Sequence, residues 1–243
     1  MDQIKVELQE VMGSDRSVAN AAWTSSLDYN KKQNRSDEEV ARVINMLADN
    51  KHASPFETIV FRFWIKMPIA TDRQFMTHRI QSSNGMSGRY RTMPAEYLDI
   101  PDDVMDICNM IPTSLSHQLL NGAGTIYGMD DFVERYYQAC EVANNSYTQM
   151  NIIAKDAEKL GHITNSQYKR FREFMRGMLP QHNMTERVSV MNLRAFANFQ
   201  KLRNSEHAQP EIRQVAKLML KCVMKSNVAP LTVNALINNK WEI

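Results

Sequence analysis

The stretch IVFRFWIK at residues 59–66 decides the class of fold, because its side chains alternate between apolar and mostly polar. Every second residue from Ile59 to Ile65 is β-branched or aromatic, whereas the positions between them include Arg62 and Lys66. A period of two over eight residues predicts a half-buried strand, which ends at the proline two residues further on.

Further elements are predicted on both sides of this strand. Alternation over residues 4–11 and 186–192 predicts two more strands. Ser36 and Glu39 have the spacing of a capping box, which predicts a helix running to about Asn50. Apolar residues at helical spacing predict helices over 17–25, 130–160, 166–178, 194–204 and 211–225, and a short one from Thr71. The proline, glycine and asparagine content over 94–128 predicts loops.

These elements indicate an α/β or α+β fold, because strands and long helices occur without a regular βαβ alternation. With 243 residues, no internal repeat and no low-complexity linker, the chain is expected to form a single domain over residues 1–243. Residues from about 95 to 165 are expected to form a variable helical segment of this domain.

Composition excludes several classes of function. The chain has 29 basic and 27 acidic residues, so it lacks the overall positive field of non-specific nucleic-acid binders. Three widely spaced cysteines favour reduced thiols over disulfides or zinc. The first residues lack the pattern of a signal peptide, and no apolar run approaches the ~20 residues that span a bilayer. We therefore expect a cytoplasmic protein that binds neither a membrane nor, stably, nucleic acid.

The segment HRIQSSNGMSGRY at residues 78–90 is too polar for a core and is interpreted as a loop that holds an anionic ligand. Polar residues also gather at 52–57, at 192–198 and at 203–209. Arginine binds phosphate bidentately, and Asn and Gln offer a donor and an acceptor to a base edge. Together these segments predict a nucleotide site. For any one of them alone, a solvated helix end with surface ion pairs is about as good an explanation.

Common cofactor and catalytic motifs are missing from the sequence. No Gly-x-Gly-x-x-Gly follows a strand, and no Walker loop occurs, so a flavin or nicotinamide would have to be held in another way. Cys108, Cys140 and Cys222 are interpreted as buried structural residues rather than nucleophiles. No His-Glu-x-x-His pattern is present, and no metal site is expected.

The order of several motifs resembles the flavin-dependent thymidylate synthases. His78-Arg79, seven residues and then Ser87-Gly88-Arg89-Tyr90 is similar to the signature of that family, with Thr77 where the family has its first arginine. The resemblance covers residues 5–225 and is weakest over 95–165. It also rests on His52-x-Ser54-Pro55-Phe56-Glu57, Arg73-Gln74-Phe75, Arg176-x-x-Leu179-Pro180, Asn192-x-Arg194, Asn198, Leu202-Arg203 and His207-Ala208-Gln209.

The resemblance implies a mixed α/β fold in which a central, mostly antiparallel sheet is flanked by long helices. It implies reductive methylation of dUMP to dTMP, with 5,10-methylenetetrahydrofolate as carbon donor, FAD as hydride carrier and NADPH as reductant. It further implies a homotetramer whose active sites are shared between subunits, and no cysteine nucleophile.

The same resemblance implies roles for individual residues. Arg203 would stabilise negative charge on the pyrimidine as N3 ionises, with Ser87 as the second catalytic residue. Those expected to bind dUMP are Gln74, Ser87, Gly88, Arg89, Arg176 and Arg203. Those expected to bind FAD are Ser54, His78, Arg79, Asn192, Arg194, Asn198 and His207. For Asn198 and His207 a helix-end hydrogen bond to the backbone is the alternative, and for Arg203 it is an ion pair with Glu206.

Two positions depart from the family pattern. Thr77 replaces an arginine, and Gly85 replaces a glutamate in the same loop. Because these two losses cancel in charge, the family residues are hypothesised to pair with each other. Two alternative functions remain open: synthesis of another 5-substituted pyrimidine nucleotide, such as 5-hydroxymethyl-dUMP, and a non-catalytic nucleotide- or RNA-binding role.

Overall fold

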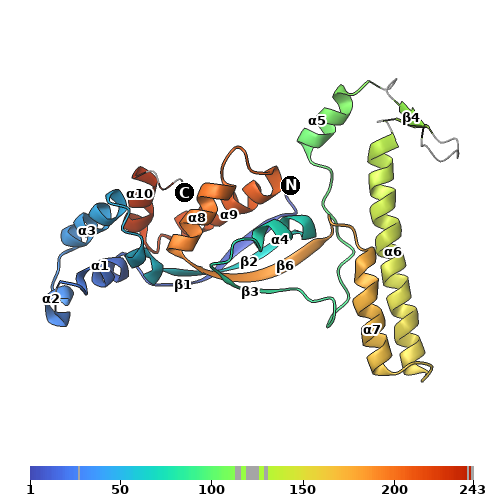
Figure 1. The fold of residues 1–243 in the computed structure, drawn as a ribbon, viewed down its shortest axis with the longest axis horizontal. Helices are drawn as coiled ribbons and strands as arrows, with labels where there is room; N and C mark the ends of the chain where they lie inside the picture. Colours follow the sequence, from blue (N-terminus) through green and yellow to red (C-terminus); the bar gives the residue numbers. More distant parts are fainter. Residues whose placement is uncertain (27, 113–115, 119–125, 129–130, 240, 242–243) are drawn as a thin grey trace. The chain divides into compact units, whose positions relative to one another are not determined.

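A computed structural model describes all of residues 1–243 except 27, 113–115, 119–125, 129–130, 240 and 242–243 (Figure 1). The chain forms two compact units. One, here the sheet unit, comprises Asp2–Met86 and Glu186–Ile243; the other, the helical unit, comprises Met1 and Ser87–Thr185. The expectation of a single domain over 1–243 stays a prediction.

The sheet unit is built on four strands in the order β1-β2-β6-β3 (Figure 1). β1 pairs antiparallel with β2, and β3 pairs antiparallel with β6, which confirms the mixed fold with a mostly antiparallel sheet. A register shift between Leu8 and Glu10 interrupts the β1–β2 ladder. The strands are β1 (Lys5–Met12), β2 (Val60–Pro68), β3 (Ser82–Gly85) and β6 (Met184–Asn192).

Helices α4 (Ile69–Phe75), α8 (Leu193–Arg203) and α9 (Pro210–Ser226) cover one face of this sheet (Figure 1). Beyond its end lie α1 (Asp15–Trp23), α2 (Tyr29–Gln33), α3 (Asp37–Asp49) and α10 (Pro230–Asn238), and α1 packs on α3, α10 and the 3-10 helix η1 (Ser54–Thr58). Helix α9 packs on β1 and β2, and α4 packs on β2. Phe61 and Phe63 of β2 are buried and lie 5.3 Å and 6.0 Å from the ring of Phe196 on α8. The apolar side chains of the alternating stretch 59–66 therefore point toward the helices.

The helical unit contains α5 (Asp102–Met110), β4 (Ser116–Gln118), β5 (Ile126–Gly128), α6 (Phe132–Lys159), α7 (Asn165–Met175) and the 3-10 helix η3 (Arg176–Met178). Helices α6 and α7 pack side by side (Figure 1). Within the described parts of α5, α6 and the remaining helices, none combines the length and apolar character needed to cross a membrane.

Most predicted elements are confirmed within two or three residues, including the capping box, in which Ser36 and Glu39 bond each other's backbone N–H groups. The prediction of loops over 94–128 is wrong in its described part. Pro101 caps α5, and Asp102 and Asp103 in its first turn favour a helix N-terminus. The prediction that 78–90 is all loop is also wrong, because Ser82–Gly85 forms the edge strand β3.

Candidate functional site

The centre of the candidate site is a hollow of about 420 Å³ in the sheet unit, between the end of α4 and one face of α8. On α8, Asn198 and Phe199 come three and four residues after Ala195, and Leu202 comes four and three residues after these two, so the four residues share one helical face. The lining residues are Thr77, His78, Arg79, Ile80, Gln81, Met191, Ala195, Asn198, Phe199, Leu202 and Arg203.

Arg203 and His78 contact each other in this hollow. Nε of Arg203 donates to Nε2 of His78 at 2.9 Å, and its Nη2 donates to the Thr77 hydroxyl at 3.4 Å. Because Nε2 accepts this bond, the imidazole is neutral and carries its proton on Nδ1. Burial, and secondly the charge of Arg203, lower the pKa of His78 below its ordinary value. A neutral partner leaves the positive charge of Arg203 uncompensated.

The position of His78 is fixed from several sides. Its ring packs edge-on against Phe199 with centroids 4.9 Å apart. Gln81 donates to the His78 carbonyl at 2.9 Å and to the Phe75 carbonyl at 3.2 Å. The Ser189 hydroxyl on β6 donates to Oε1 of Gln81 at 2.5 Å, which ties the turn after α4 to the sheet.

Gln74 lies on the same helix as Phe75. Its Nε2 donates to Oε1 of Gln209 at 2.5 Å, whereas its own Oε1 is buried and has no hydrogen-bond partner among the described residues. A buried acceptor without a donor is uncommon in folded proteins and favours a ligand that donates to it. The contact with Gln209 places Gln74 beside the 203–209 segment.

Four predicted nucleotide-binding residues lie in the helical unit. The backbone N–H of Arg89 donates to the Ser87 hydroxyl at 3.3 Å, and Nε of Arg89 lies 2.6 Å from a carboxylate oxygen of Glu173 on α7. Arg176 follows α7 and donates to the Glu173 carbonyl at 3.3 Å. Glu173 thus bonds Nε of both arginines, one through its carboxylate and the other through its carbonyl.

Gly88 allows the Arg176 side chain to pack closely against the backbone. A Cβ atom at Gly88 would lie 2.3 Å from Cδ and 2.9 Å from Cγ of Arg176. Both atoms belong to the stem of the side chain, which cannot shift without moving the guanidinium. Glycine at 88 is therefore required for the observed position of Arg176.

The other predicted flavin-binding residues lie apart from the 420 Å³ hollow. Ser54 lines a separate hollow with His52 and Pro55. Asn192 caps α8, with its side chain accepting from the N–H of Ala195 at 2.8 Å. Arg194 forms an ion pair with Glu57 at 2.6 Å, and the backbone N–H of His207 donates to the Ser205 hydroxyl at 3.3 Å. None of these four side chains contacts the His78–Arg203 pair in the described structure.

Sequence reasoning missed the apolar part of the hollow. Ile80, Met191, Phe199 and Leu202 line it beside the cations. The one available signal was the helical spacing of Ala195, Phe199 and Leu202, which is equally typical of an ordinary core face. Among the described residues, no group of three His, Cys, Asp or Glu side chains is placed to hold a metal ion.

The donor set of the hollow fits a flavin. A flavin is planar and partly apolar with polar edges and an anionic tail, and the hollow combines apolar side chains with Arg79, Arg203 and the Asn198 amide. Arg79 and Asn198 are both exposed at its rim. No phosphate-binding loop is needed, since arginines supply the charge.

The family model and the relatives that match this chain all point to one protein family. The family model described as thymidylate synthase complementing protein matches residues 7–230. The flavin-dependent thymidylate synthase of Kosmotoga olearia is 34% identical over 239 residues, which cover 96% of this chain and 90% of that protein. The flavin-dependent thymidylate synthase of Thermotoga neapolitana is 30% identical, with 100% and 94% coverage.

A solved structure also matches. The UMP/dUMP methylase PolB from Streptomyces cacaoi, bound with 5-Br dUMP, superposes with a TM-score of 0.70 at 26% sequence identity. The match covers 97% of this chain and 95% of that one. The likeness therefore extends over both units of the chain.

Proposed function

The chain belongs to the thymidylate synthase complementing protein family, the flavin-dependent thymidylate synthases, and we propose that this methyltransferase converts dUMP to dTMP. In the proposed reaction 5,10-methylenetetrahydrofolate supplies the carbon and NADPH the reducing equivalents. Bound FAD would supply the hydride. We further propose a cytoplasmic homotetramer with active sites shared between subunits.

The observation that supports this proposal most is the neutral partner of Arg203. Nucleophilic attack by C5 of a pyrimidine requires electron density that is released when N3 loses its proton, and a fixed cation stabilises the resulting anion. Arg203 is oriented through Nε by a neutral imidazole, so its charge is not cancelled by a carboxylate. Its Nη2 donates to the Thr77 hydroxyl at 3.4 Å.

We assign dUMP binding to Gln74, Arg203 and the group formed by Ser87, Gly88, Arg89 and Arg176. Two arginines bonded by one residue, Glu173, suit a phosphate monoester. The unsatisfied Oε1 of Gln74 suits a donor on the base or sugar. Arg89 would exchange Glu173 for the ligand, because the Arg89 side chain is 60% exposed and can turn away from that ion pair.

We assign flavin binding to His78, Arg79 and Asn198 in the hollow and to Ser54, Asn192, Arg194 and His207 around it. His78 accepts from Arg203 and contacts Phe199, so it can align the flavin edge relative to the arginine. Ser87 stays a proposed catalytic residue, as a hydroxyl that could shuttle or hold a proton on the nucleotide.

Mass spectrometry of the nucleotide product tests this function. The purified protein would be incubated with FAD, NADPH, methylenetetrahydrofolate and dUMP, and a matched reaction would omit NADPH. NADPH-dependent gain of one methylene unit supports dTMP synthesis. A hydroxymethyl product would favour the alternative pyrimidine synthesis, and unchanged dUMP with no flavin bound would favour a non-catalytic relative.

UMP is a second candidate substrate, since the solved relative is described as a UMP/dUMP methylase. The same reaction run with UMP in place of dUMP separates the two. Methylation of dUMP alone supports thymidylate synthesis, whereas comparable turnover of both nucleotides would indicate that the site does not read the 2′-hydroxyl.

A further inference from the structure

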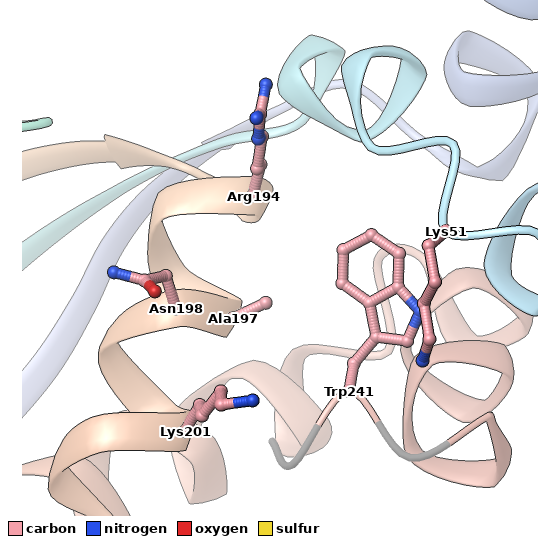
Figure 2. A pocket seen from close by; sticks show the side chains of 6 residues that line it. All are labelled: Lys51, Arg194, Ala197, Asn198, Lys201 and Trp241. Carbon is pink, nitrogen blue, oxygen red and sulfur yellow. The ribbon is translucent and has the colours of Figure 1, made fainter.

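A buried arginine on β6 joins three elements of the sheet unit. Nε and Nη2 of Arg187 donate to the two carboxylate oxygens of Asp72 on α4 at 2.6 Å and 2.8 Å, and Nη1 donates to the Ser83 hydroxyl on β3 at 2.8 Å. The Arg187 side chain is only 7% exposed. Arg194 differs, because it extends from α8 with its side chain 54% exposed and pairs with Glu57 at the surface (Figure 2). All three nitrogens of the Arg187 guanidinium are therefore bonded, in a place where water competes little.

Gly85 leaves the space that this guanidinium occupies. In the β3–β6 ladder Gly85 lies opposite Arg187, so side chains at the two positions point to the same face of the sheet. A Cβ atom at Gly85 would lie 3.3 Å from Nη2 and 3.5 Å from Cζ of Arg187. A longer side chain at 85 would meet the guanidinium that Asp72 and Ser83 hold. The arginine of β6 therefore fills the place beside the edge strand that a side chain at 85 would otherwise take.

The strand β3 needs support from outside itself. It consists of Ser82–Gly85, lies at the edge of the sheet and pairs there with β6. Three of its four residues are exposed, and none carries an apolar side chain that could pack on a core. Strands this short are marginally stable unless one of their faces is packed. The bond from Arg187 to the Ser83 hydroxyl therefore adds a tie between β3 and the body of the unit, which continues through Asp72 to α4.

The chain runs from β3 directly into the group assigned to dUMP. The N–H of Met86, one residue beyond β3, donates to the carbonyl of Glu186 at 2.8 Å, and the loop Ser87–Arg89 follows. β3 is thus held at Ser83 by a side chain and just beyond its end by the backbone. Binding residues that are already in place lose less entropy when their ligand arrives. The support of β3 therefore bears on how tightly the loop that follows it can hold a nucleotide.

We propose that Arg187 is a positioning residue for the nucleotide: its guanidinium, held by Asp72, fixes β3 through Ser83 and so presets the loop Ser87–Arg89. Arg187 is buried and acts through the strand and the loop rather than by contact with dUMP. The proposal rests on the proposed function, which assigns dUMP to this loop. An ion pair that only stabilised the fold would affect every ligand alike. A positioning pair affects dUMP and leaves FAD, whose assigned residues lie on other segments, nearly unchanged.

The pair can be removed without leaving a buried charge behind. Arg187→Met combined with Asp72→Leu replaces both partners by apolar side chains of similar size, a change that is often neutral for stability. In this double variant, amide hydrogen exchange of Ser82–Met86 should be at least about tenfold faster than in the wild type, because local opening becomes easier. Calorimetry on the full chain should show dUMP affinity about tenfold weaker, the scale of ordering one or two further side chains on binding, and FAD affinity changed by less than about twofold.

Ser83→Ala tests the same tie at an exposed side chain, so it remains informative if the double variant does not fold. It should speed exchange in β3 and weaken dUMP binding about threefold, within the range for one hydrogen bond. Ser82→Ala is the matched control, because Ser82 is also exposed but its side chain points to the opposite face of the strand. It should change neither the exchange nor the affinity.

Unchanged exchange in the double variant, or an equal loss of dUMP and FAD affinity, would overturn the proposal. Faster exchange with unchanged dUMP affinity would overturn it too, since β3 would then not set the loop. The exchange measurement needs no ligand, and it separates failure of this proposal from failure of the proposed function. If the wild type binds no dUMP, the proposed function fails, while faster exchange in both variants still shows that Arg187 fixes β3. If dUMP binds equally well to the wild type and both variants, the function stands and the positioning role of Arg187 is removed.

Discussion

Nε of Arg203 on α8 donates a hydrogen bond of 2.9 Å to Nε2 of His78, which follows α4. The two residues lie 125 positions apart in the chain, and their contact joins the signature segment to the C-terminal motifs. The geometry requires an unprotonated Nε2 on His78. Protonation of this imidazole would place two cations in contact and break the bond.

The pH dependence of stability should report this contact. Burial first and Arg203 second lower the pKa of His78 in the folded chain below its ordinary 6.5. Between the two pKa values the unfolded chain binds more protons, so stability is complete above about pH 6.5 and falls as the pH drops toward the lowered value. His78→Gln should flatten this fall when the thermal midpoint is measured across that range.

His162→Gln is the control for this measurement, because His162 is exposed in the helical unit and should leave the slope as in the wild type. A slope that is the same in wild type and His78→Gln would contradict the lowered pKa.

Arg203→Lys should reduce kcat about 100-fold, the cost typical of losing one preorganised donor at a developing anion. Lysine keeps the charge but lacks the planar fork that bonds His78 and Thr77 at once. Steady-state rates of dTMP formation would show the loss. In Arg203→Met, which also removes the positive charge at 203, His78 should titrate at a higher pH by NMR, whereas in Arg203→Lys it should not. Arg213→Lys on α9 is the matched control, and a comparable loss there would argue against a specific role of Arg203.

Gly88→Ala should raise KM for dUMP about tenfold or more, because a Cβ at this position displaces the stem of Arg176. In an Arg176→Ala background the same substitution should have almost no further effect, since the clashing atoms are gone. Gly177→Ala is a matched control, as nothing lies within 4 Å of a Cβ there. Additive losses from Gly88→Ala and Arg176→Ala would show that the glycine acts elsewhere.

Sequence patterns predicted those helices and strands that are determined by residues close together in the chain. Alternation identified β2 and the Ser36–Glu39 spacing identified α3, because side-chain period and capping depend on near neighbours. The edge strand β3 was not predictable in this way. Ser82–Gly85 is polar and gains its conformation from pairing with β6, a hundred residues away.

Residue chemistry pointed to candidate side chains for the site but not to how they are grouped. The structure places His78, Arg79, Asn198 and Arg203 around one hollow, and their roles stay proposals. Trp241 gave no signal, because a single aromatic residue beyond α10 has no motif around it. Its indole is positioned by contacts with Ala48 on α3 and Phe56 on η1, which lie far from it in the sequence.

Asp72→Asn should destabilise the chain by about 3–5 kcal/mol, the cost of breaking a buried ion pair. Arg187 donates through Nε and Nη2 to both carboxylate oxygens of Asp72 at 2.6 Å and 2.8 Å, and the two side chains are only 7% and 15% exposed. Glu10→Gln breaks the exposed pair with Arg62 and should cost at most about 1 kcal/mol. Urea unfolding of both variants measures the difference, and equal costs would mean that Arg187 finds another partner.

The last prediction concerns Thr77 and Gly85, the two positions that depart from the family signature. If an arginine at 77 paired with a glutamate at 85, Thr77→Arg alone would lower activity more than Thr77→Arg combined with Gly85→Glu. A Cβ at Gly85, however, lies 3.3 Å from Nη2 of Arg187, which Asp72 and Ser83 already bond. A glutamate there would compete with Asp72 rather than reach residue 77.

The structure therefore favours additive effects of the two substitutions. Thr77→Arg should lower activity by placing a second guanidinium beside Arg203, whose Nη2 now bonds the Thr77 hydroxyl. Gly85→Glu should lower stability through Arg187, and the double variant should show both losses. Rates of product formation and thermal midpoints for all four proteins decide the question. Recovery of activity in the double variant would instead support pairing of residues 77 and 85.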